Sequence, residues 1–324
     1  MRPTASSRRP KGPTFSPATI ESIIPAAWPP NQERNPPMAT RIGFIGLGDM
    51  GGAMAGILAP NGFDACVYDL NPVPVQELAE GGATAGTSCR QVGEHAEVLS
   101  ICVPADAHVE AVLLGEGGAL DGMAEGSIIL IHSTVQPDTI EKMEAAARAR
   151  GIGLIDACVT GGRAAAETGD LTMLVGGEEA LVEQARPVLE AYGKSVMHAG
   201  PLGSGAKLKL AVNLLTYVNW AAIAESYRLA KASGLDTNAF VEAVKSNGQL
   251  SQMQQRFLSS IEMPPEAAAS DGFQDFVRLQ MHTAEKDLAH ALELGRKSGI
   301  ALPAAGLVAQ DMARIYRVID DGRR

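Results

Sequence analysis

The sequence predicts an α/β fold in which a doubly wound, mostly parallel sheet covered by helices is followed by an all-helical domain. Short apolar runs alternate with helix-like segments from residue 41 to about residue 200. Beyond Gly205 the strand-like runs end, and "AKLKLAVNLLTYVNWAAIAESYRLAKASG" predicts one long helix that joins the two parts. We therefore expect one domain over residues 41–200 and a second, all-helical domain over residues 201–324.

The individual strands follow from short apolar segments bounded by turn residues. We expect them at residues 41–48, 64–69, 97–104, 126–132, 151–157 and 171–177. Helices are expected between several of these strands, for example over residues 137–150 and 178–193. This alternation predicts parallel strands connected through helices.

The first residues have a different composition. Residues 1–37 hold nine of the nineteen prolines and five basic residues against two acidic ones. Such a segment cannot build a core, so we expect a disordered, proline-rich tail over residues 1–40. Its arginines and serines leave an organellar transit peptide open, although the prolines oppose an amphipathic helix. The alternative is an extension without function, because Met38 opens "MATRIGFIGLG" in the manner of a natural start.

Composition excludes several classes of protein. The formal net charge of −10 argues against nucleic acid or an anionic membrane as a partner. No apolar run approaches the roughly 20 residues of a membrane span. The four cysteines form no CxxC pair, so we expect free thiols in a reducing compartment and a cytoplasmic location. The six histidines show no metal-ligand spacing, so no metal site is expected.

A glycine loop follows the first predicted strand. Gly46, Gly48 and Gly51 in "GLGDMG" have GxGxxG spacing, which lets a turn tighten, a diphosphate approach the backbone, and a helix pack on its strand. We expect the whole loop, with Leu47, Asp49 and Met50, to bind a dinucleotide at the helix N-terminus, giving a Rossmann-type domain. Asp69 ends the second strand, where a carboxylate accepts hydrogen bonds from ribose hydroxyls and repels a 2′-phosphate. NAD is therefore expected rather than NADP.

Two further polar patches follow strand ends, where ligands bind in open α/β sheets. Ser133 and Thr134 follow one strand, and Thr160, Gly161 and Gly162 follow the next. Adjacent glycine N–H groups and a hydroxyl suit a substrate carboxylate. An ordinary helix start capped by Thr160 is the alternative.

Together these motifs resemble the β-hydroxyacid dehydrogenase family, which includes 3-hydroxyisobutyrate dehydrogenase and tartronate semialdehyde reductase. The resemblance spans about residues 41–318 and depends on six segments in family order: "GFIGLGDMG", "STVQP", "DACVTGG", "GDLTMLVGG", "GSGAKLKLAVN" and "EKDLAHALELGRKSGIALP". It implies an NAD-binding domain over residues 41–200 and a helical domain over residues 201–324 that is similar to that of 6-phosphogluconate dehydrogenase. That second domain would carry substrate contacts and mediate assembly into a homodimer or homotetramer.

The resemblance also implies an enzyme, an NAD(P)-dependent oxidoreductase that transfers hydride between nicotinamide and a small β-hydroxy acid, or reduces the matching semialdehyde. Lys209 would be the general acid/base, with its pKa lowered by burial, and Asn213 one turn later would orient the substrate. Lys207 would lie at the surface. The carboxylate of the substrate would be held by Thr160, Gly161 and Gly162, with Ser133 near the nicotinamide. The cofactor set is completed by Val103, Thr134 and Lys286, with Asp287 supporting the helix.

Three departures from the family pattern leave the substrate open. Thr160 stands where a serine is usual, Cys158 where a proline is usual, and Val212 where an asparagine is frequent. Arg163 could pair with a second acidic group of the substrate or face solvent. The alternative functions are an imine or other carbonyl reductase on the same scaffold, and a catalytically silent binding protein; Lys209 counts against both.

Overall fold

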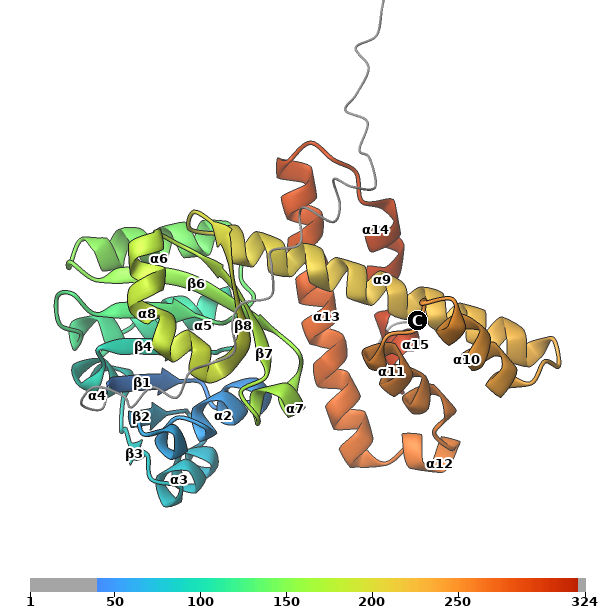
Figure 1. Ribbon diagram of the computed structural model, residues 1–324, viewed down its shortest axis with the longest axis horizontal. Helices are drawn as coiled ribbons and strands as arrows, with labels where there is room; N and C mark the ends of the chain where they lie inside the picture. Colours follow the sequence, from blue (N-terminus) through green and yellow to red (C-terminus); the bar gives the residue numbers. More distant parts are fainter. Residues whose placement is uncertain (1–39, 320–324) are drawn as a thin grey trace, which may run out of the picture. The chain divides into compact units, whose positions relative to one another are not determined.

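The computed structural model describes residues 40–319, and it has the predicted fold class. The expectations for the tail over residues 1–40 lie outside the described residues, apart from Thr40. The first part is an eight-stranded sheet with the order β3-β2-β1-β4-β5-β6-β7-β8 (Figure 1). Its strands are β1 (Arg41–Ile45), β2 (Asp64–Tyr68), β3 (Thr84–Ala85), β4 (Val98–Ile101), β5 (Ile128–Ile131), β6 (Gly153–Thr160), β7 (Leu171–Gly176) and β8 (Gly193–Gly200).

Every neighbouring pair of strands is parallel except β6 and β7, which are antiparallel. The helices that connect the parallel strands are α2 (Asp49–Gly56), α3 (Pro72–Glu80), α4 (Cys89–His95), α5 (Asp106–Leu114), α6 (Pro137–Arg148) and α8 (Glu179–Tyr192). The short α7 (Arg163–Ala166) lies between the antiparallel strands β6 and β7. Two 3₁₀ turns complete the connections, Ala59–Asn61 and Ala119–Asp121.

All six predicted strands are present, with ends that differ by up to three residues. Two strands lie outside the prediction, the two-residue β3 and the longer β8. The sequence of β8, "GKSVMHAG", has no continuous apolar run, because this strand lies at the edge of the sheet and pairs only with β7. A central parallel strand is buried on both faces and shows such a run, whereas an edge strand need not.

The core of the sheet part consists of two clusters, one on each face. Successive side chains of a strand point to opposite faces, so Ile128 and Leu130 pack in one cluster while Ile129 and Ile131 pack in the other. Helices α2 and α8 bury residues in the first cluster, and α4, α5 and α6 bury residues in the second. The sheet is therefore covered on both faces, as the β-α alternation predicts.

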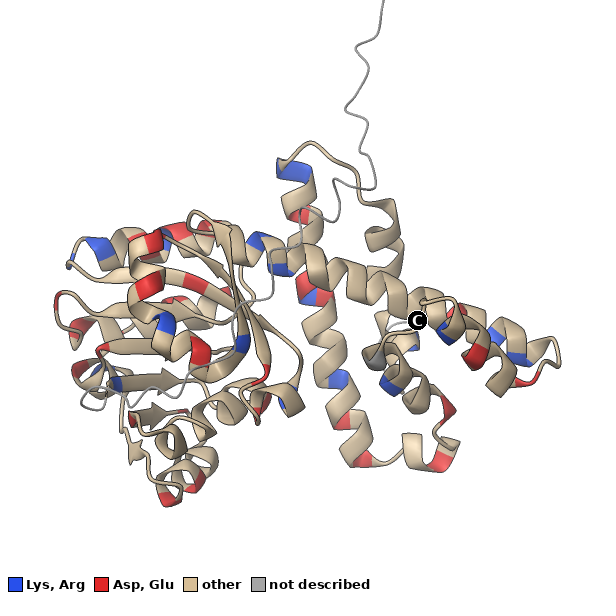
Figure 2. Ribbon diagram, in the orientation of Figure 1, with Lys and Arg blue, Asp and Glu red and all other residues tan. Residues whose placement is uncertain are grey.

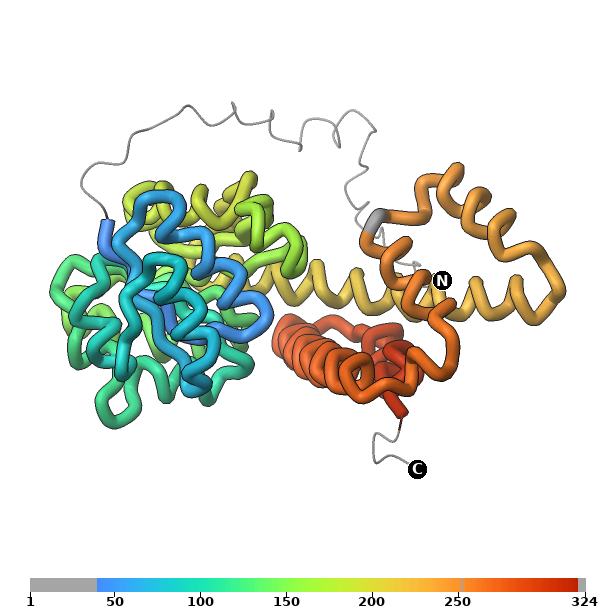
Figure 3. Tube along the Cα trace, turned by 90° about the horizontal axis from the view of Figure 1, so that it is seen from below, coloured from blue at the N-terminus to red at the C-terminus, as the bar shows by residue number. Residues whose placement is uncertain are grey.

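From Ser204 onward, every regular element within residues 40–319 is a helix. These are α9 (Ser204–Ala232), α10 (Thr237–Ser246), α11 (Gln252–Glu262), α12 (Pro265–Ala268), α13 (Asp271–Lys297), α14 (Pro303–Gln310) and α15 (Met312–Tyr316). Figure 3 shows α9 leaving the sheet part and crossing α13, against which it packs. A third apolar cluster surrounds this crossing, with Trp220 stacked on Phe257 at 5.1 Å between ring centroids.

The start of α9 packs closely on β6 and β7. The carboxylate of Asp156 on β6 is fully buried and accepts the backbone N–H groups of Gly203 and Ala206, both at 2.7 Å. Gly205 lies between them, and a Cβ atom there would stand 2.3 Å from the carbonyl oxygen of Leu174. Glycine at this position therefore permits the long helix to begin directly against the sheet.

A row of hydrogen-bonded polar side chains is buried on the face of the sheet that α2 and α8 cover. The hydroxyl of Ser100 lies 2.9 Å from the Tyr192 hydroxyl and 3.1 Å from Nε2 of His132, while Nδ1 of His132 lies 2.8 Å from the carbonyl oxygen of Ala157. The His132 ring also stacks on Phe44. Burial lowers the pKa of His132 to about 4, so the imidazole is neutral in the folded chain at neutral pH.

We expect Gly205→Ala to destabilise the protein by about 2 kcal/mol or more, because the backbone carbonyl at Leu174 cannot move aside as a side chain could. Chemical denaturation followed by circular dichroism measures this loss. Gly306→Ala in α14 is the matched control, since its added Cβ meets no atom within 4 Å and alanine favours a helix. Equal stability of the two variants would contradict the close approach of α9.

We expect the free energy of unfolding to fall as the pH is lowered from about 6.5 to about 4. The unfolded chain protonates His132 near its ordinary pKa, whereas the folded chain does so only near 4, so the unfolded state binds more protons between these values. The loss attributable to this residue approaches roughly 3 kcal/mol. His132→Gln should flatten the pH dependence of urea unfolding, whatever its absolute stability, whereas the exposed His108→Gln should not.

Candidate active site

The three glycines of the loop between β1 and α2 have different surroundings. Gly46 has φ +93°, and its Cβ would stand 2.4 Å from the Cys102 carbonyl oxygen. A Cβ on Gly51 would stand 1.9 Å from the carbonyl oxygen of Gly46. Gly48, in contrast, faces open space, with no atom within 4 Å of its Cβ position. The first and third glycines thus permit the turn and its packing, and the second leaves the backbone accessible.

The N-terminus of α2 opens at the same place. Gly48 is the N-cap and provides no side-chain hydrogen bond, and the N–H groups of Asp49, Met50 and Gly51 make no hydrogen bond with residues 40–319. Unpaired N–H groups at a helix N-terminus favour a phosphate. This backbone therefore fits the diphosphate of a dinucleotide, as the spacing of the loop predicts.

Asp69 ties this loop to the end of β2. Its carboxylate accepts the N–H of Leu47 at 2.6 Å and the N–H of Asn71 at 2.8 Å. Asn71 in turn caps α3 by accepting the N–H of Val73. A carboxylate fixed beside the glycine loop can accept hydrogen bonds from a ribose, and its charge opposes a phosphate on that ribose.

The loops after β4 and β5 are joined to each other. The N–H of Val103 donates to the hydroxyl of Ser133 at 2.8 Å, and the Sγ of Cys158 on β6 lies 3.6 Å from the Ser133 carbonyl oxygen. Burial raises the pKa of the Cys158 thiol to about 12, so it stays neutral. The carbonyl oxygen of Thr134 accepts a hydrogen bond from Lys286 of α13 at 2.5 Å.

The loop after β6 has a backbone that suits glycine. Gly161 has φ +137° and Gly162 has φ +77°, both in the left-handed half of conformational space. Gly162 is the N-cap of α7, with no side-chain cap hydrogen bond, so Thr160 is not the cap of a helix. For Arg163 the sequence allows either a pair with a second acidic group of the substrate or a position facing solvent. Its guanidinium forms ion pairs with Asp49 and Glu167, and its side chain is partly exposed.

The two lysines at the start of α9 differ in their surroundings. Lys207 is exposed, and Lys209 is partly buried. Burial lowers the pKa of the Lys209 amine, and this effect outweighs the opposing attraction of Asp287. Its Nζ makes no hydrogen bond or ion pair with any residue in the described range, so the amine is available to a bound molecule.

Asp287 of α13 gathers the polar groups around Lys209. It is only 2% exposed and accepts hydrogen bonds from Asn213 Nδ2 at 2.6 Å, Tyr217 Oη at 3.2 Å and Lys286 Nζ at 2.7 Å. Asn213, expected to bind substrate, therefore has its amide nitrogen occupied by Asp287 and only its oxygen without a hydrogen bond to the described residues. The cluster fixes α13 to α9 beside the loop that carries Thr134.

Sequence reasoning did not identify Asp156 or Tyr217. An aspartate within an apolar strand is the signal that could have indicated Asp156, because a fully buried carboxylate needs donors. Tyr217 lies eight residues after Lys209 on the same helix, which places both on one face. Its partner is on α13, 70 residues away along the chain, so the pairing has no local signal.

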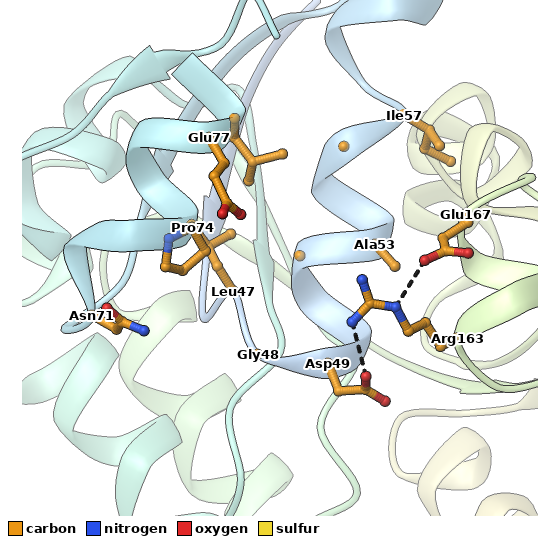
Figure 4. Close-up of a pocket in the computed structure, with 13 residues that line it drawn as sticks. Leu47, Gly48, Asp49, Ala53, Ile57, Asn71, Pro74, Glu77, Arg163 and Glu167 are labelled. Carbon is orange, nitrogen blue, oxygen red and sulfur yellow. Dashed lines mark hydrogen bonds and ion pairs between the residues drawn. The ribbon is translucent and has the colours of Figure 1, made fainter. Parts of the chain in front are cut away.

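The structure thus brings the predicted residues together in two connected groups. The glycine loop and Asp69 form one, and Ser133, Thr134, Lys209, Asn213, Lys286 and Asp287 form the other. The Val103–Ser133 hydrogen bond joins the loop after β4 to the second group, and the Asp49–Arg163 ion pair joins the first group to the loop after β6 that carries Thr160, Gly161 and Gly162. A cavity of about 680 Å³ lies beside the glycine loop, lined by α2, α3 and α7, and includes neither Ser133 nor Lys209 (Figure 4).

Charged residues of both signs are interspersed along the helices in Figure 2. Within residues 40–319, no group of three or more histidine, cysteine, aspartate or glutamate side chains could hold a metal ion. None of the helices in that range is long and apolar enough to cross a bilayer. The four cysteines, all within the described range, are free thiols.

The fold and the glycine loop define a dinucleotide-binding protein, and comparison with known proteins gives its family and its class as an oxidoreductase. Residues 41–200 match the family model described as the NAD binding domain of 6-phosphogluconate dehydrogenase. Residues 203–322 match the model described as NAD-binding of NADP-dependent 3-hydroxyisobutyrate dehydrogenase. The chain belongs to the β-hydroxyacid dehydrogenase family and is an NAD(P)-dependent dehydrogenase of that family.

Named relatives cover nearly all of the chain outside the tail. A 3-hydroxyisobutyrate dehydrogenase of Pseudomonas aeruginosa is 35% identical over 281 residues, covering 87% of this chain and 93% of its own. An NAD-dependent L-serine dehydrogenase of the same organism is 34% identical over 279 residues, covering 86% and 92%. The structure of Mycobacterium tuberculosis 3-hydroxyisobutyrate dehydrogenase with L-serine superposes with a TM-score of 0.73 at 25% identity, over 89% of this chain and all of that one.

Imine reductases share the scaffold at a greater distance. The enzyme of Myxococcus stipitatus has a TM-score of 0.60 and 18% sequence identity. At that identity the likeness shows the fold alone.

Proposed function

We propose that this enzyme transfers hydride between NAD and a small β-hydroxy acid, or reduces the corresponding semialdehyde, with Lys209 as general acid/base. The observation that carries the proposal is the Lys209 amine. It is partly buried, has a lowered pKa, and makes no hydrogen bond with the described residues, next to the Asp287 cluster and Cys158. A lysine with an ordinary pKa near 10.4 is a poor base at neutral pH, and burial shifts the pKa of Lys209 in the direction that this role needs.

The cofactor is assigned to the first group of residues, together with Val103 and with two members of the second group. Gly46, Leu47, Gly48, Asp49, Met50 and Gly51 would hold the diphosphate through their backbone, Asp69 would accept the ribose hydroxyls, and Val103, Thr134 and Lys286 would lie along the nicotinamide half. When bound, the nicotinamide supplies hydride transfer in either direction. The contacts of Lys286 with the Thr134 carbonyl oxygen and with Asp287 support its place beside that loop.

The substrate is assigned to Ser133, Lys209 and Asn213 of the second group, together with the loop after β6. The N–H groups of Gly161 and Gly162 and the hydroxyl of Thr160 would bind the carboxylate, and Ser133 and the amide oxygen of Asn213 would orient the reacting hydroxyl. Lys209, as the neutral amine, takes the hydroxyl proton during oxidation and, as the ammonium ion, returns it during reduction. The names of the similar enzymes place 3-hydroxyisobutyrate and L-serine first among the substrates to be tested.

Assembly into a homodimer or homotetramer through the helical domain is part of the proposal. Leu215 and Leu229 of α9 and Phe276 and Leu279 of α13 are exposed apolar side chains, which a second copy could cover. Sedimentation of the full chain tests this assembly against its monomer mass of 33.8 kDa. The free thiols support a reducing, cytoplasmic compartment.

The alternatives are an imine or other carbonyl reductase and a catalytically silent binding protein. Lys209 opposes the binding protein, because a proton relay is of no use to a protein that only binds. The imine reductase is opposed by the relatives, since the named dehydrogenases are 34–35% identical and the imine reductase of Myxococcus stipitatus is 18% identical. Imine reduction by the purified protein, without turnover of any hydroxy acid, would favour the first alternative.

We expect Lys209→Met to lower kcat for hydroxy-acid oxidation by about 100-fold or more, because it removes the amine assigned to accept the hydroxyl proton. NADH absorbance is followed while 3-hydroxyisobutyrate, glycerate, threonate and L-serine are supplied. The dissociation constant for NADH should change little, and Lys207→Met, which removes an exposed amine two residues away, should keep wild-type kcat. Full turnover by Lys209→Met would overturn the assigned role.

We expect NAD to be used with a kcat/KM at least about tenfold above that for NADP. Asp69→Asn should lower the ratio of kcat/KM for NAD to kcat/KM for NADP, because it removes the negative charge that repels the 2′-phosphate of NADP. It keeps an oxygen that can accept the Leu47 N–H. Asp64→Asn, an exposed charge at the other end of β2, is the control and should leave the ratio unchanged. A wild-type preference for NADP would contradict the assignment.

A further inference from the structure

An ion pair joins the glycine loop to the loop after β6. Nη1 of Arg163, the first residue of α7, lies 3.0 Å from Oδ1 of Asp49, the first residue of α2, although 114 residues separate them along the chain. Nε of Arg163 lies 2.8 Å from Oε1 of Glu167, one turn later. Figure 4 shows the guanidinium between the two carboxylates at the edge of the cavity.

The contribution of this pair to stability is expected to be small. The side chains of Arg163 and Asp49 are 58% and 37% exposed, and pairs of that kind contribute about 0–1 kcal/mol. The Arg163–Asp49 pair is distinguished by its position at the glycine loop. Asp49 lies at the N-terminus of α2, whose first three N–H groups have no hydrogen-bond partner among the described residues.

An acidic side chain at this point has two opposite effects. A carboxylate in the first turn favours the helix, because it opposes the helix dipole. A dinucleotide diphosphate bound to the same N–H groups would be repelled by that carboxylate. A glycine loop that must accept a diphosphate therefore needs the charge of Asp49 to be balanced.

We propose that Arg163 is a positioning residue that balances the charge of Asp49 and so allows the glycine loop to bind the diphosphate of the dinucleotide. The inference rests on the cofactor site of the proposed function. The net charge of this cluster of side chains, Asp49, Glu167 and Arg163, is −1. Without the arginine charge, the two carboxylates carry −2. Because Arg163 directly follows Gly161 and Gly162, the same contact fixes the start of the substrate loop relative to the cofactor loop.

The test is a double-mutant cycle on cofactor binding. Arg163→Gln should raise the dissociation constant of NADH about five- to tenfold at low salt, and this change should shrink as ionic strength rises. Asp49→Asn should bind at least as well as wild type. Arg163→Gln combined with Asp49→Asn should return to within about twofold of Asp49→Asn alone, and Arg163→Lys should keep most of the affinity. NADH fluorescence titration measures all four without turnover.

Arg90→Gln is the matched control, because Arg90 pairs with Glu94 on α4 with the same exposure of 58% and lies in another part of the sheet domain. It should leave NADH binding unchanged. A double variant that binds as weakly as Arg163→Gln would overturn the inference, since the arginine would then act through packing. An unchanged dissociation constant for NADH with a raised KM for substrate would also overturn it and would assign Arg163 to the substrate. Failure of wild type to bind either dinucleotide would instead overturn the proposed cofactor site, and the inference with it.

Discussion

The arrangement of this site depends on one buried carboxylate. Asp156 is fully buried in β6, and burial raises its pKa, yet it accepts two backbone N–H groups from the beginning of α9. Those N–H groups would otherwise have no partner at a helix start packed on the sheet. The carboxylate and Gly205 together fix where α9 leaves the sheet, and therefore where Lys209, one turn further on, is placed.

A second carboxylate, that of Asp287, fixes the position of α13 beside the proposed site. Asp287 binds Asn213 and Tyr217 of α9 and also Lys286, which reaches the Thr134 carbonyl oxygen in the sheet part. Two further contacts of α13 lead to the same part, from His290 to Asp106 at 3.4 Å and from Lys297 to Asp138 at 2.6 Å. One face of α13 therefore carries the polar connections between the helical domain and the loops around the proposed substrate site.

The chemistry proposed for Lys209 depends on a balance between two effects on its amine. Desolvation favours the neutral amine, and the nearby Asp287 favours the ammonium ion. Asp287 already accepts three hydrogen bonds, so its charge is partly satisfied, and desolvation prevails. An amine in this balance can both accept and return a proton, which the proposed role of Lys209 requires.

The sequence by itself determined the fold class, the glycine loop and the long helix. Each of these depends on residues close together in the chain, because the geometry of strands, helices and tight turns produces apolar periodicity and GxGxxG spacing. It also indicated that Lys209 is less exposed than Lys207, through the family pattern around "GSGAKLKLAVN". Only the tertiary structure decided that β8 extends the sheet, that Asp156 caps α9, that Tyr217 contacts Asp287, and that Arg163 pairs with Asp49. Each of these contacts joins residues that are distant along the chain. Local sequence propensity cannot select such partners, because only the packing of the helices against the sheet brings them within reach.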